Sequence, residues 1–505
     1  MLPAAVPADS QLVGPPLADA SGTSRRLFVA AVRLALLAGV AIRLAIVFGP
    51  LGRLNSDEAI SGLVARHLLD GEWTTFFWGQ AYGGTLESIL LAPLLLLSPA
   101  DGPVLVALPL VELIVIWRLV WLITRRQLGN DGAWMVIAVM AIFPVSFVWF
   151  GTRPMLFYQP TLILGLLAVH LVQLIVDGDG RRRCWLGLGL CAGLGWWTSP
   201  QSVFFMLPCA VWIVARRRPS ARAVGWLAMA AVVGAAPWLA ANMRSGWASL
   251  DALPGNGLSY PERLEVQFRS GLPMSLGLRV PFTEQWIVAG GGLLLGATGL
   301  AAFAIAIIIA LRRGHLNTPL TGVLLVFPLL HALGATSWFV GNGRYYYFLG
   351  PVIAYIFAAA VRRHGGRVLM LAVMMVISAV GFDRFSEVSV ASDDMGAVIR
   401  ALEHEGVHDV YAQFWIAYRL TWDAEERIVA SPDIADRYPA YSVRVRAADR
   451  VAYLFWMPSD ADQLRYAQIG AGLAGAGIAA RVIDVRSYRL LLPERNVPPE
   501  ALPGD

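Results

Sequence analysis

Lysine is absent from this chain of 505 residues, so all 40 of its basic residues are arginines. Charged residues are also scarce, at 15% of the sequence against 57% hydrophobic residues. The net charge of +5 does not indicate a nucleic-acid-binding surface, because many of the arginines cluster beside apolar runs. Together with a mean hydropathy of +0.59, this composition is typical of a polytopic membrane protein.

Cysteine is also rare, with three residues in the chain. Cys184, Cys191 and Cys209 all fall inside apolar segments, and their spacing matches neither a disulfide framework nor a metal site. Residues 1–26 are rich in Pro, Ala, Ser and Gly and carry no apolar core of their own. We expect them to form a disordered cytoplasmic tail, and the first span to be an uncleaved anchor.

Apolar runs long enough to cross roughly 30 Å of hydrocarbon recur between residues 27 and 382. They predict a mainly α-helical membrane domain with about eleven spans. The runs lie at residues 27–49, 103–123, 132–150, 160–176, 184–198, 201–215, 222–241, 286–311, 318–339, 346–361 and 366–382.

Arginine clusters mark alternate connections between these runs, whereas the opposite connections carry mostly single arginines. The clusters include Arg25-Arg26, Arg125-Arg126, Arg181 to Arg183, Arg216 to Arg218, Arg312-Arg313 and Arg362-Arg363. Because positive loops stay in the cytoplasm, the N-terminus is predicted to be cytoplasmic and the loop 50–102 to lie outside. With eleven spans, the tail after residue 382 is also outside.

That tail, residues 383–505, regains charged residues, and short strand-like runs alternate with helical patterns. It is predicted to be a small soluble α/β domain outside the membrane. The segment Gly470 to Gly475 matches the dinucleotide fingerprint GxGxxG, but it continues a helical run instead of following a strand. We interpret it as a packing stretch of small residues.

The first outer loop, 50–102, opens with Asn55-Ser56-Asp57-Glu58. Apolar residues at helical spacing follow, which predicts an amphipathic helix over 57–70 lying on the membrane surface. Asp57 and Glu58 then have two interpretations. They are first-turn acids of a helix capped by Asn55, or they are catalytic, with Asp57 as a general base for a hydroxyl acceptor.

Later in this loop, aromatic, amide, carboxylate and glycine residues are packed together. Rings at a membrane interface often serve only as anchors. Glycines such as Gly83 and Gly84 allow close backbone approach, while amides and carboxylates suit sugar hydroxyls. We therefore predict that the loop binds substrate, through Trp78, Gln80, Tyr82 and Glu87.

Further candidates lie at the outer ends of other spans. Arginine suits phosphate, but an arginine at a span end also snorkels to lipid headgroups, and both interpretations stay open. The predicted substrate-binding residues from these segments are Arg153, Trp197, Gln201, Arg244, Arg344 and Tyr345. Arg43 and Glu112, within the first two spans, are expected to form a structural ion pair, with a transport pathway as the alternative.

With these residues placed, the chain resembles the GT-C class of membrane glycosyltransferases, in the branch of protein O-mannosyltransferases and bacterial aminoarabinose transferases. Three features carry the resemblance: Asp57-Glu58 in a long outer loop, the following stretch with Gly71-Glu72-Trp73 and Gly79-Gln80-Ala81-Tyr82, and Arg344-Tyr345 opening a late span. The Lys-Pro-Pro stretch of many relatives is replaced here by Gly83 to Glu87.

The resemblance implies that Asp57 is a catalytic base or a metal ligand, which leaves a divalent cation open as cofactor, and that Arg344 contacts the donor's phosphate. The expected protein is a multi-pass bacterial cell-membrane enzyme. Because nucleotide sugars are made in the cytoplasm, an enzyme working outside needs a polyprenyl-phosphate sugar as donor. The acceptor is a hydroxyl on a glycan, lipid or protein, and a single base predicts inversion.

Two other functions remain as alternatives, a transporter or flippase for a lipid-linked glycan and a non-catalytic protein of envelope assembly. A transporter is expected to place charges near the midplane in two matching halves. This sequence has no internal repeat, and its polar groups concentrate at one predicted face of the membrane.

Overall fold

The fold is described from a computed structural model, which places residues 18–97, 102–154, 156–251, 257–334, 337, 341–388 and 395–502. Residues 1–17 of the predicted tail 1–26 lie outside this described part. Helix α1 (Ala18–Phe48) already begins at Ala18. Residues 18–26 are therefore helical and extend the first span instead of belonging to a disordered tail.

The described N-terminal part of the chain is mainly helical, with short 3-10 segments that include η1 (Pro50–Gly52), η2 (Pro200–Ser202) and η5 (Gly343–Leu349). The helices after α1 are α2 (Ser56–Leu69), α3 (Leu86–Leu95), α4 (Gly102–Ile142), α5 (Val145–Phe150), α6 (Tyr158–Val176), α7 (Arg182–Thr198), α8 (Val203–Arg216), α9 (Ala221–Gly234), α10 (Ala236–Ser245), α11 (Tyr260–Val266), α12 (Leu272–Ser275), α13 (Gly292–Arg312), α14 (Pro319–His331), α15 (Gly350–Ala360) and α16 (His364–Val388).

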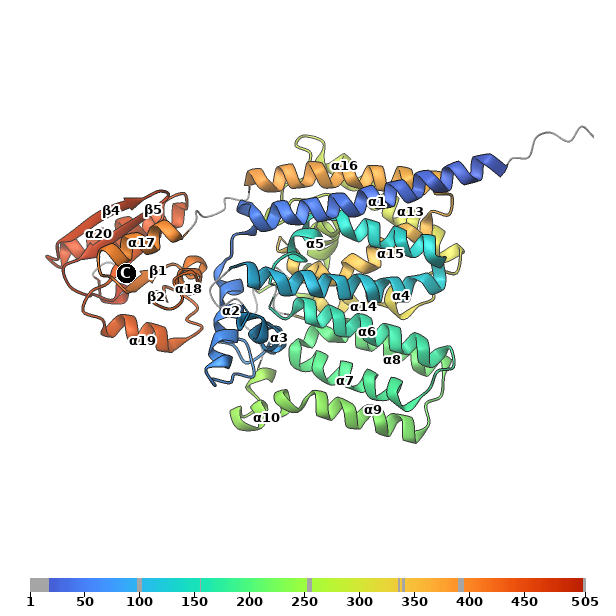
Figure 1. The fold of residues 1–505 in the computed structure, drawn as a ribbon, viewed down its shortest axis with the longest axis horizontal. Coiled ribbons are helices and arrows are strands. Elements are labelled where there is room, and N and C mark those ends of the chain that lie inside the picture. The colour runs from blue at the N-terminus through green and yellow to red at the C-terminus, as the bar shows by residue number, and fades with distance from the viewer. Residues whose placement is uncertain are drawn as a thin grey trace, which may run out of the picture.

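The long helices pack side by side as a bundle of nearly parallel rods (Figure 1). Neighbouring contacts run in the order α16, α1, α4, α6, α7 and α9. Helix α4 is two helices joined at Gly129, whose φ of 67° is outside the helical region. Glycine adopts this conformation at little cost, so the chain reverses there. The break separates the two predicted runs 103–123 and 132–150.

Each of the eleven predicted apolar runs contains a helix, which confirms the mainly helical fold class. Within the described residues, five helices are long and apolar enough to cross a membrane, or six if the bent pair α9 and α10 is one span. Three shorter apolar helices lie at Leu86–Leu95, Pro200–Arg216 and Pro319–His331. The number of eleven spans stays a prediction.

The C-terminal domain contains a five-stranded sheet in the order β2-β1-β3-β5-β4, which confirms the predicted α/β domain. Its strands are β1 (Asp409–Ala412), β2 (Val429–Pro432), β3 (Ala452–Trp456), β4 (Ala480–Val485) and β5 (Tyr488–Pro493). β1 is parallel to both neighbours, with Val410 opposite Ala430 and Ala452, while β5 is antiparallel to β3 and β4.

Four helices accompany the sheet: α17 (Gly396–His404), α18 (Phe414–Asp423), α19 (Pro439–Ala447) and α20 (Asp460–Gly475). Helix α16 runs on to Val388, so the domain begins later than the predicted boundary at residue 383. The GxGxxG segment occupies the last turns of α20 and is helical throughout. A dinucleotide-binding loop follows directly after a strand, and this segment does not.

Helix α2 lies between the helical bundle and the C-terminal domain (Figure 1). It packs against α3 on one side and α18 on the other, and residues Ser56 to Ala65 are all buried. A Cβ atom at Gly62 would lie 2.7 Å from the Trp422 ring of α18. The helix predicted over 57–70 is therefore present, but it is buried between α3 and α18 instead of lying on a surface, because the C-terminal domain packs against it.

The predicted ion pair between Arg43 and Glu112 is not among the ion pairs of the described residues. Arg43 instead donates through Nη1 to the backbone carbonyls of Gly39 at 3.0 Å and Ala141 at 2.6 Å. Both Arg43 and Glu112 are nevertheless buried in the bundle. The arginine therefore ties α1 to the second half of α4 through backbone oxygens.

The first prediction tests the topology with two isosteric replacements at opposite ends of the bundle. Ser245 ends α10 near the C-terminal domain, and Ser220 precedes α9 at the far end; both are exposed, and the native cysteines are buried. In intact cells, a membrane-impermeant maleimide should label Ser245→Cys but not Ser220→Cys, because the arginine-rich end is predicted to face the cytoplasm. Labelling in the reverse pattern would place the first loop in the cytoplasm.

Candidate active site

The site begins at the N-terminus of α2, which has a complete capping box. Asn55 Oδ1 accepts from Glu58 N at 3.1 Å, and Glu58 Oε2 accepts from Asn55 N at 2.9 Å. This exchange satisfies backbone donors that the first turn of a helix leaves unpaired. Asp57 lies immediately before Glu58, so the same capping box holds the first turn that carries Asp57.

Glu58 is occupied by structural contacts on both of its oxygens. Arg153, in the segment after α5, donates through Nε to Glu58 Oε1 at 2.6 Å and through Nη2 to Oε2. The same guanidinium bonds the carbonyl oxygens of Leu51 and Arg53, and both charged side chains are only 4% exposed. Arg153 therefore closes the loop entry onto the bundle. These contacts give no support to the predicted catalytic role of Glu58 or the predicted substrate-binding role of Arg153.

Asp57 forms a second, more accessible ion pair. Arg344 at the start of η5 donates through Nη1 to Asp57 Oδ2 at 3.0 Å, and the two side chains are 12% and 21% exposed for Asp57 and Arg344. Burial works to lower the pKa of Arg344, but Tyr158, Tyr345 and Asp57 outweigh it and raise that pKa above its usual range. The structure thus brings together the two residues predicted as base and phosphate contact, 287 positions apart.

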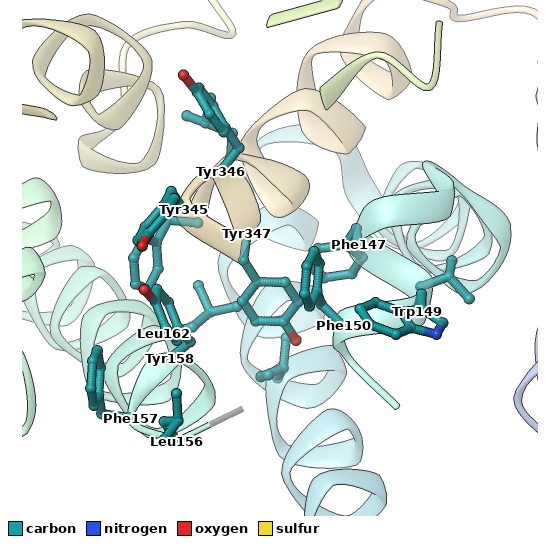
Figure 2. Close-up of a cluster of buried hydrophobic side chains, with 14 of the residues drawn as sticks. Phe147, Trp149, Phe150, Leu156, Phe157, Tyr158, Leu162, Tyr345, Tyr346 and Tyr347 are labelled. Atoms are coloured by element: carbon teal, nitrogen blue, oxygen red, sulfur yellow. The ribbon is translucent and has the colours of Figure 1, made fainter. Parts of the chain in front are cut away.

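Tyrosines surround this pair. Figure 2 shows the rings of Tyr345 and Tyr158 close together, and their centroids lie 6.2 Å apart. Tyr82 also belongs here, since its hydroxyl interacts electrostatically with Tyr345, Arg344 and Asp57. Burial raises the pKa of Tyr82, so its hydroxyl stays protonated and available as a donor. Tyr158 was not among the predicted site residues, because its position opening α6 looks like an ordinary interfacial anchor.

The three successive tyrosines of η5 have separate contacts. In Figure 2, Tyr345 points toward Tyr158, whereas Tyr347 points toward Phe147 and Tyr346 points away from both. The Tyr347 and Phe147 rings are stacked at 4.7 Å. Only Tyr345 of the three therefore joins the group around Asp57, and the other two pack the core.

Two of the predicted aromatic residues hold the first loop in place. Trp197 Nε1 donates to the carbonyl of Thr75 at 2.9 Å, and a Cβ at Gly84 would lie 2.6 Å from the Trp197 carbonyl oxygen. Trp78 stacks on Tyr438 of the C-terminal domain, with ring centroids 4.2 Å apart. Both tryptophans are buried, so neither offers an open stacking surface beside Asp57.

The remaining predicted residues are spread more widely. Gln80 is half-buried, and its Nε2 would lie 3.2 Å from a Cβ at Gly83, beside Phe157. Glu87 is buried in the first turn of α3, and Gln201 is half-buried in η2. Arg244 is exposed at the end of α10, with no ion pair to any described residue. These contacts do not join Arg244 to the group around Asp57.

A polar cluster joins α2 to the C-terminal domain. His67 lies between two carboxylates, with Nδ1 2.7 Å from Glu72 Oε2 and Nε2 2.8 Å from Glu426 Oε1. Tyr441 and Arg66 also bond Glu426, and Tyr438 donates to Glu72 at 2.9 Å. The sequence did not predict this cluster, because its members come from three separate segments.

The charges of this cluster depend on one another. Burial works to lower the pKa of His67, but hydrogen bonds with Glu426 and Glu72 outweigh it and raise that pKa. Burial works in the opposite direction on Glu426, yet bonds from His67, Tyr441 and Arg66 lower its pKa to about 2. The docked arrangement therefore favours a protonated His67 between two ionised carboxylates.

A metal site was left open by the sequence. Within the described ranges, the structure contains no group of three or more His, Cys, Asp or Glu side chains able to hold a metal ion. The chemistry visible around Asp57 is instead that of a carboxylate paired with a guanidinium and surrounded by hydroxyls. Such a group accepts a proton from a hydroxyl and binds an anion.

No family model and no curated protein matches the chain. Among solved structures, the fold is similar to that of ArnT from Cupriavidus metallidurans. With undecaprenyl phosphate bound, ArnT aligns at a TM-score of 0.54 and 11% identity, covering 91% of this chain and 97% of its own. The apo state of ArnT aligns at a TM-score of 0.55 and 10% identity, covering 94% of this chain and 98% of its own. The chain therefore has the GT-C fold that the sequence resemblance implied.

The second prediction concerns the buried pair. Replacing Arg153 with Met should destabilise the protein by roughly 3–5 kcal/mol, because Glu58 would keep a buried charge without its partner. The double variant Glu58→Gln, Arg153→Met should recover part of this loss. Arg384→Met, which breaks an exposed pair with Glu387, is the control and should cost about 1 kcal/mol or less. Unfolding of the purified variants measures the effect; wild-type stability of Arg153→Met would contradict it.

The third prediction concerns pH. The folded-state pKa of His67 is raised, so its contribution to docking is complete below its usual pKa of about 6.5 and is lost as pH rises through the raised value. Hydrogen-exchange protection factors in α2 and α18 should therefore fall as pH rises above the usual histidine pKa of about 6.5 and through the raised value. His67→Gln should flatten this dependence. Protection that stays constant or increases with pH in the wild type would refute the assignment.

Proposed function

We propose that this protein is a membrane glycosyltransferase that moves a sugar from a polyprenyl-phosphate donor to a hydroxyl acceptor on the outer face of the bacterial cell membrane. The observation that carries the proposal is the Asp57–Arg344 pair, which is less deeply buried than Glu58–Arg153, with Arg344 Nη1 3.0 Å from Asp57 Oδ2 at the end of the bundle where the C-terminal domain lies. The fold supports it, because ArnT has the same fold and binds a polyprenyl phosphate. Fold alone does not decide function, so the site residues carry the argument.

In the proposed reaction, Asp57 removes the proton of the acceptor hydroxyl as its oxygen attacks the anomeric carbon of the donor sugar. The bond from that carbon to the phosphate oxygen breaks, and the lipid phosphate leaves with the electron pair. One base and no covalent intermediate give inversion at the anomeric carbon. The proton ends on Asp57 and the negative charge on the phosphate, so the step is balanced.

Arg344 would serve this step in two ways. Its guanidinium holds the Asp57 carboxylate in place, at the N-terminus of α2. A negatively charged phosphate beside the pair would compete with Asp57 for the guanidinium. As Arg344 shifts toward the phosphate, the carboxylate loses a counter-charge and becomes a stronger base at the moment when it must take a proton.

The hydroxyls of Tyr82 and Tyr345 supply hydrogen-bond donors around the same carboxylate, which suits a sugar. The contacts leave the identity of the sugar open and fit an acceptor on a glycan, a lipid or a protein. A flippase would need a path through the bundle, whereas the accessible charges described here gather at one end of it.

The fourth prediction tests the base. Asp57→Asn should lower sugar transfer by about 10²–10⁴-fold, the usual contribution of general-base catalysis, while leaving expression and unfolding close to wild type. Transfer is measured with purified protein, a radiolabelled polyprenyl-phosphate sugar and membrane acceptors. Asp70→Asn, an exposed acid at the other end of the same helix, is the matched control. Wild-type turnover by Asp57→Asn would reduce Asp57 to a helix-terminal residue.

A further inference from the structure

Arg437 is a half-buried residue of the C-terminal domain, in the segment between β2 and α19. The hydroxyl of Tyr418 accepts from the backbone nitrogens of Arg437 at 2.6 Å and Tyr438 at 3.1 Å. Tyr418 N, in turn, donates to Ser56 Oγ at 3.1 Å, one residue before Asp57. A single tyrosine thus connects the backbone of Arg437 to the N-terminus of the helix that carries Asp57.

The side chain of Arg437 reaches into the first loop. Its Nη1 donates to the carbonyl of Gly79 at 3.5 Å. Gly79 has a φ of +68°, and a Cβ there would lie 2.7 Å from Arg437 Cα. The two backbones can approach this closely only because residue 79 has no side chain.

Arg437 and the Asp57–Arg344 pair both act electrostatically on the Tyr82 hydroxyl. Burial raises the pKa of Tyr82, and Arg437 is the charge that most strongly opposes this shift, ahead of Arg344. Asp57 also acts on the same hydroxyl. Arg437 contacts Gly79, three residues before Tyr82, so Tyr82 lies within electrostatic reach of both Arg437 and the Asp57–Arg344 pair.

Arg437 differs from the other two arginines in what it already binds. Arg153 is paired with Glu58 and Arg344 with Asp57. Arg437 forms no ion pair with a carboxylate anywhere in the described part of the chain, and its Nε is buried without a hydrogen-bond partner. Oδ1 of the neighbouring Asp436 accepts hydrogen bonds from the Tyr418 hydroxyl and from the Tyr438 backbone nitrogen. A half-buried guanidinium with an unused donor favours binding of an anion.

We propose that Arg437 binds the phosphate of the lipid-linked donor, so that the C-terminal domain completes the donor site. The proposal rests on the proposed glycosyl transfer. Arg344 is paired with Asp57, whereas the positive charge of Arg437 is not neutralised by a carboxylate of the described residues. A guanidinium binds phosphate through several N–H groups at once, whereas the ammonium of Lys acts as a point charge. Arg is therefore better suited than Lys to this position.

The experiment measures binding of two lipid probes to the full-length protein in detergent: undecaprenyl phosphate, and undecaprenol, which has the same chain and no phosphate. Arg437→Gln should weaken binding of the phosphate by about tenfold and leave the alcohol unchanged. Arg437→Lys should recover part of the loss. Arg444→Gln removes a charge from α19, where Arg444 is paired with Asp409, and should match the wild type.

Three results would overturn the inference. Equal phosphate binding by Arg437→Gln and wild type would remove Arg437 from the donor site. Equal weakening of both lipids would mean that Arg437 only holds the loop, because a structural role cannot distinguish phosphate from alcohol. A loss confined to the Michaelis constant for the acceptor, with phosphate binding intact, would assign the anion to the acceptor. Failure of the wild type itself to prefer the phosphate would instead remove the proposed donor, and with it the proposed function.

Discussion

Two neighbouring carboxylates buried at the start of one helix are the constraint on which the rest of the site depends. An isolated ionised group away from water is costly, so Asp57 and Glu58 each need a cation. Neither finds one nearby in sequence. Glu58 takes Arg153 from the segment after α5, and Asp57 takes Arg344 from η5. These two pairs bring three distant parts of the bundle together at the mouth of the first loop.

The two ion pairs differ in how deeply their side chains are buried. The Glu58–Arg153 pair is almost completely buried and also binds two backbone carbonyls, so nothing in it is left to bind a substrate. The Asp57–Arg344 pair is partly open and has hydroxyls of Tyr82 and Tyr345 around it. Adjacent acids in the sequence thus have different partners and are buried to different depths.

The C-terminal domain is the second support of this site. Tyr418 and Trp422 of α18 cover the face of α2 that the bundle leaves open, and Tyr438 stacks on Trp78 of the first loop. Because most of α2 is buried between the two parts of the molecule, the position of Asp57 depends on both. A domain attached by a late span is thereby built into a site formed by the first loop.

Local patterns in the sequence were enough to predict the helical membrane domain, the α/β tail and the capped helix after Asn55. Each of these follows from forces within one segment, namely the solvation of apolar runs and the hydrogen bonds of a helix end. Which arginine meets which acid could not be predicted, because Asp57 and Arg344 are 287 residues apart and many arginines were candidates. The burial of α2, the loop-holding roles of Trp78 and Trp197, and the place of Arg437 beside Gly79 were decided only when the tertiary structure packed separate segments together. Contacts of this kind depend on the whole fold, so they cannot be predicted from the periodicity of a single segment.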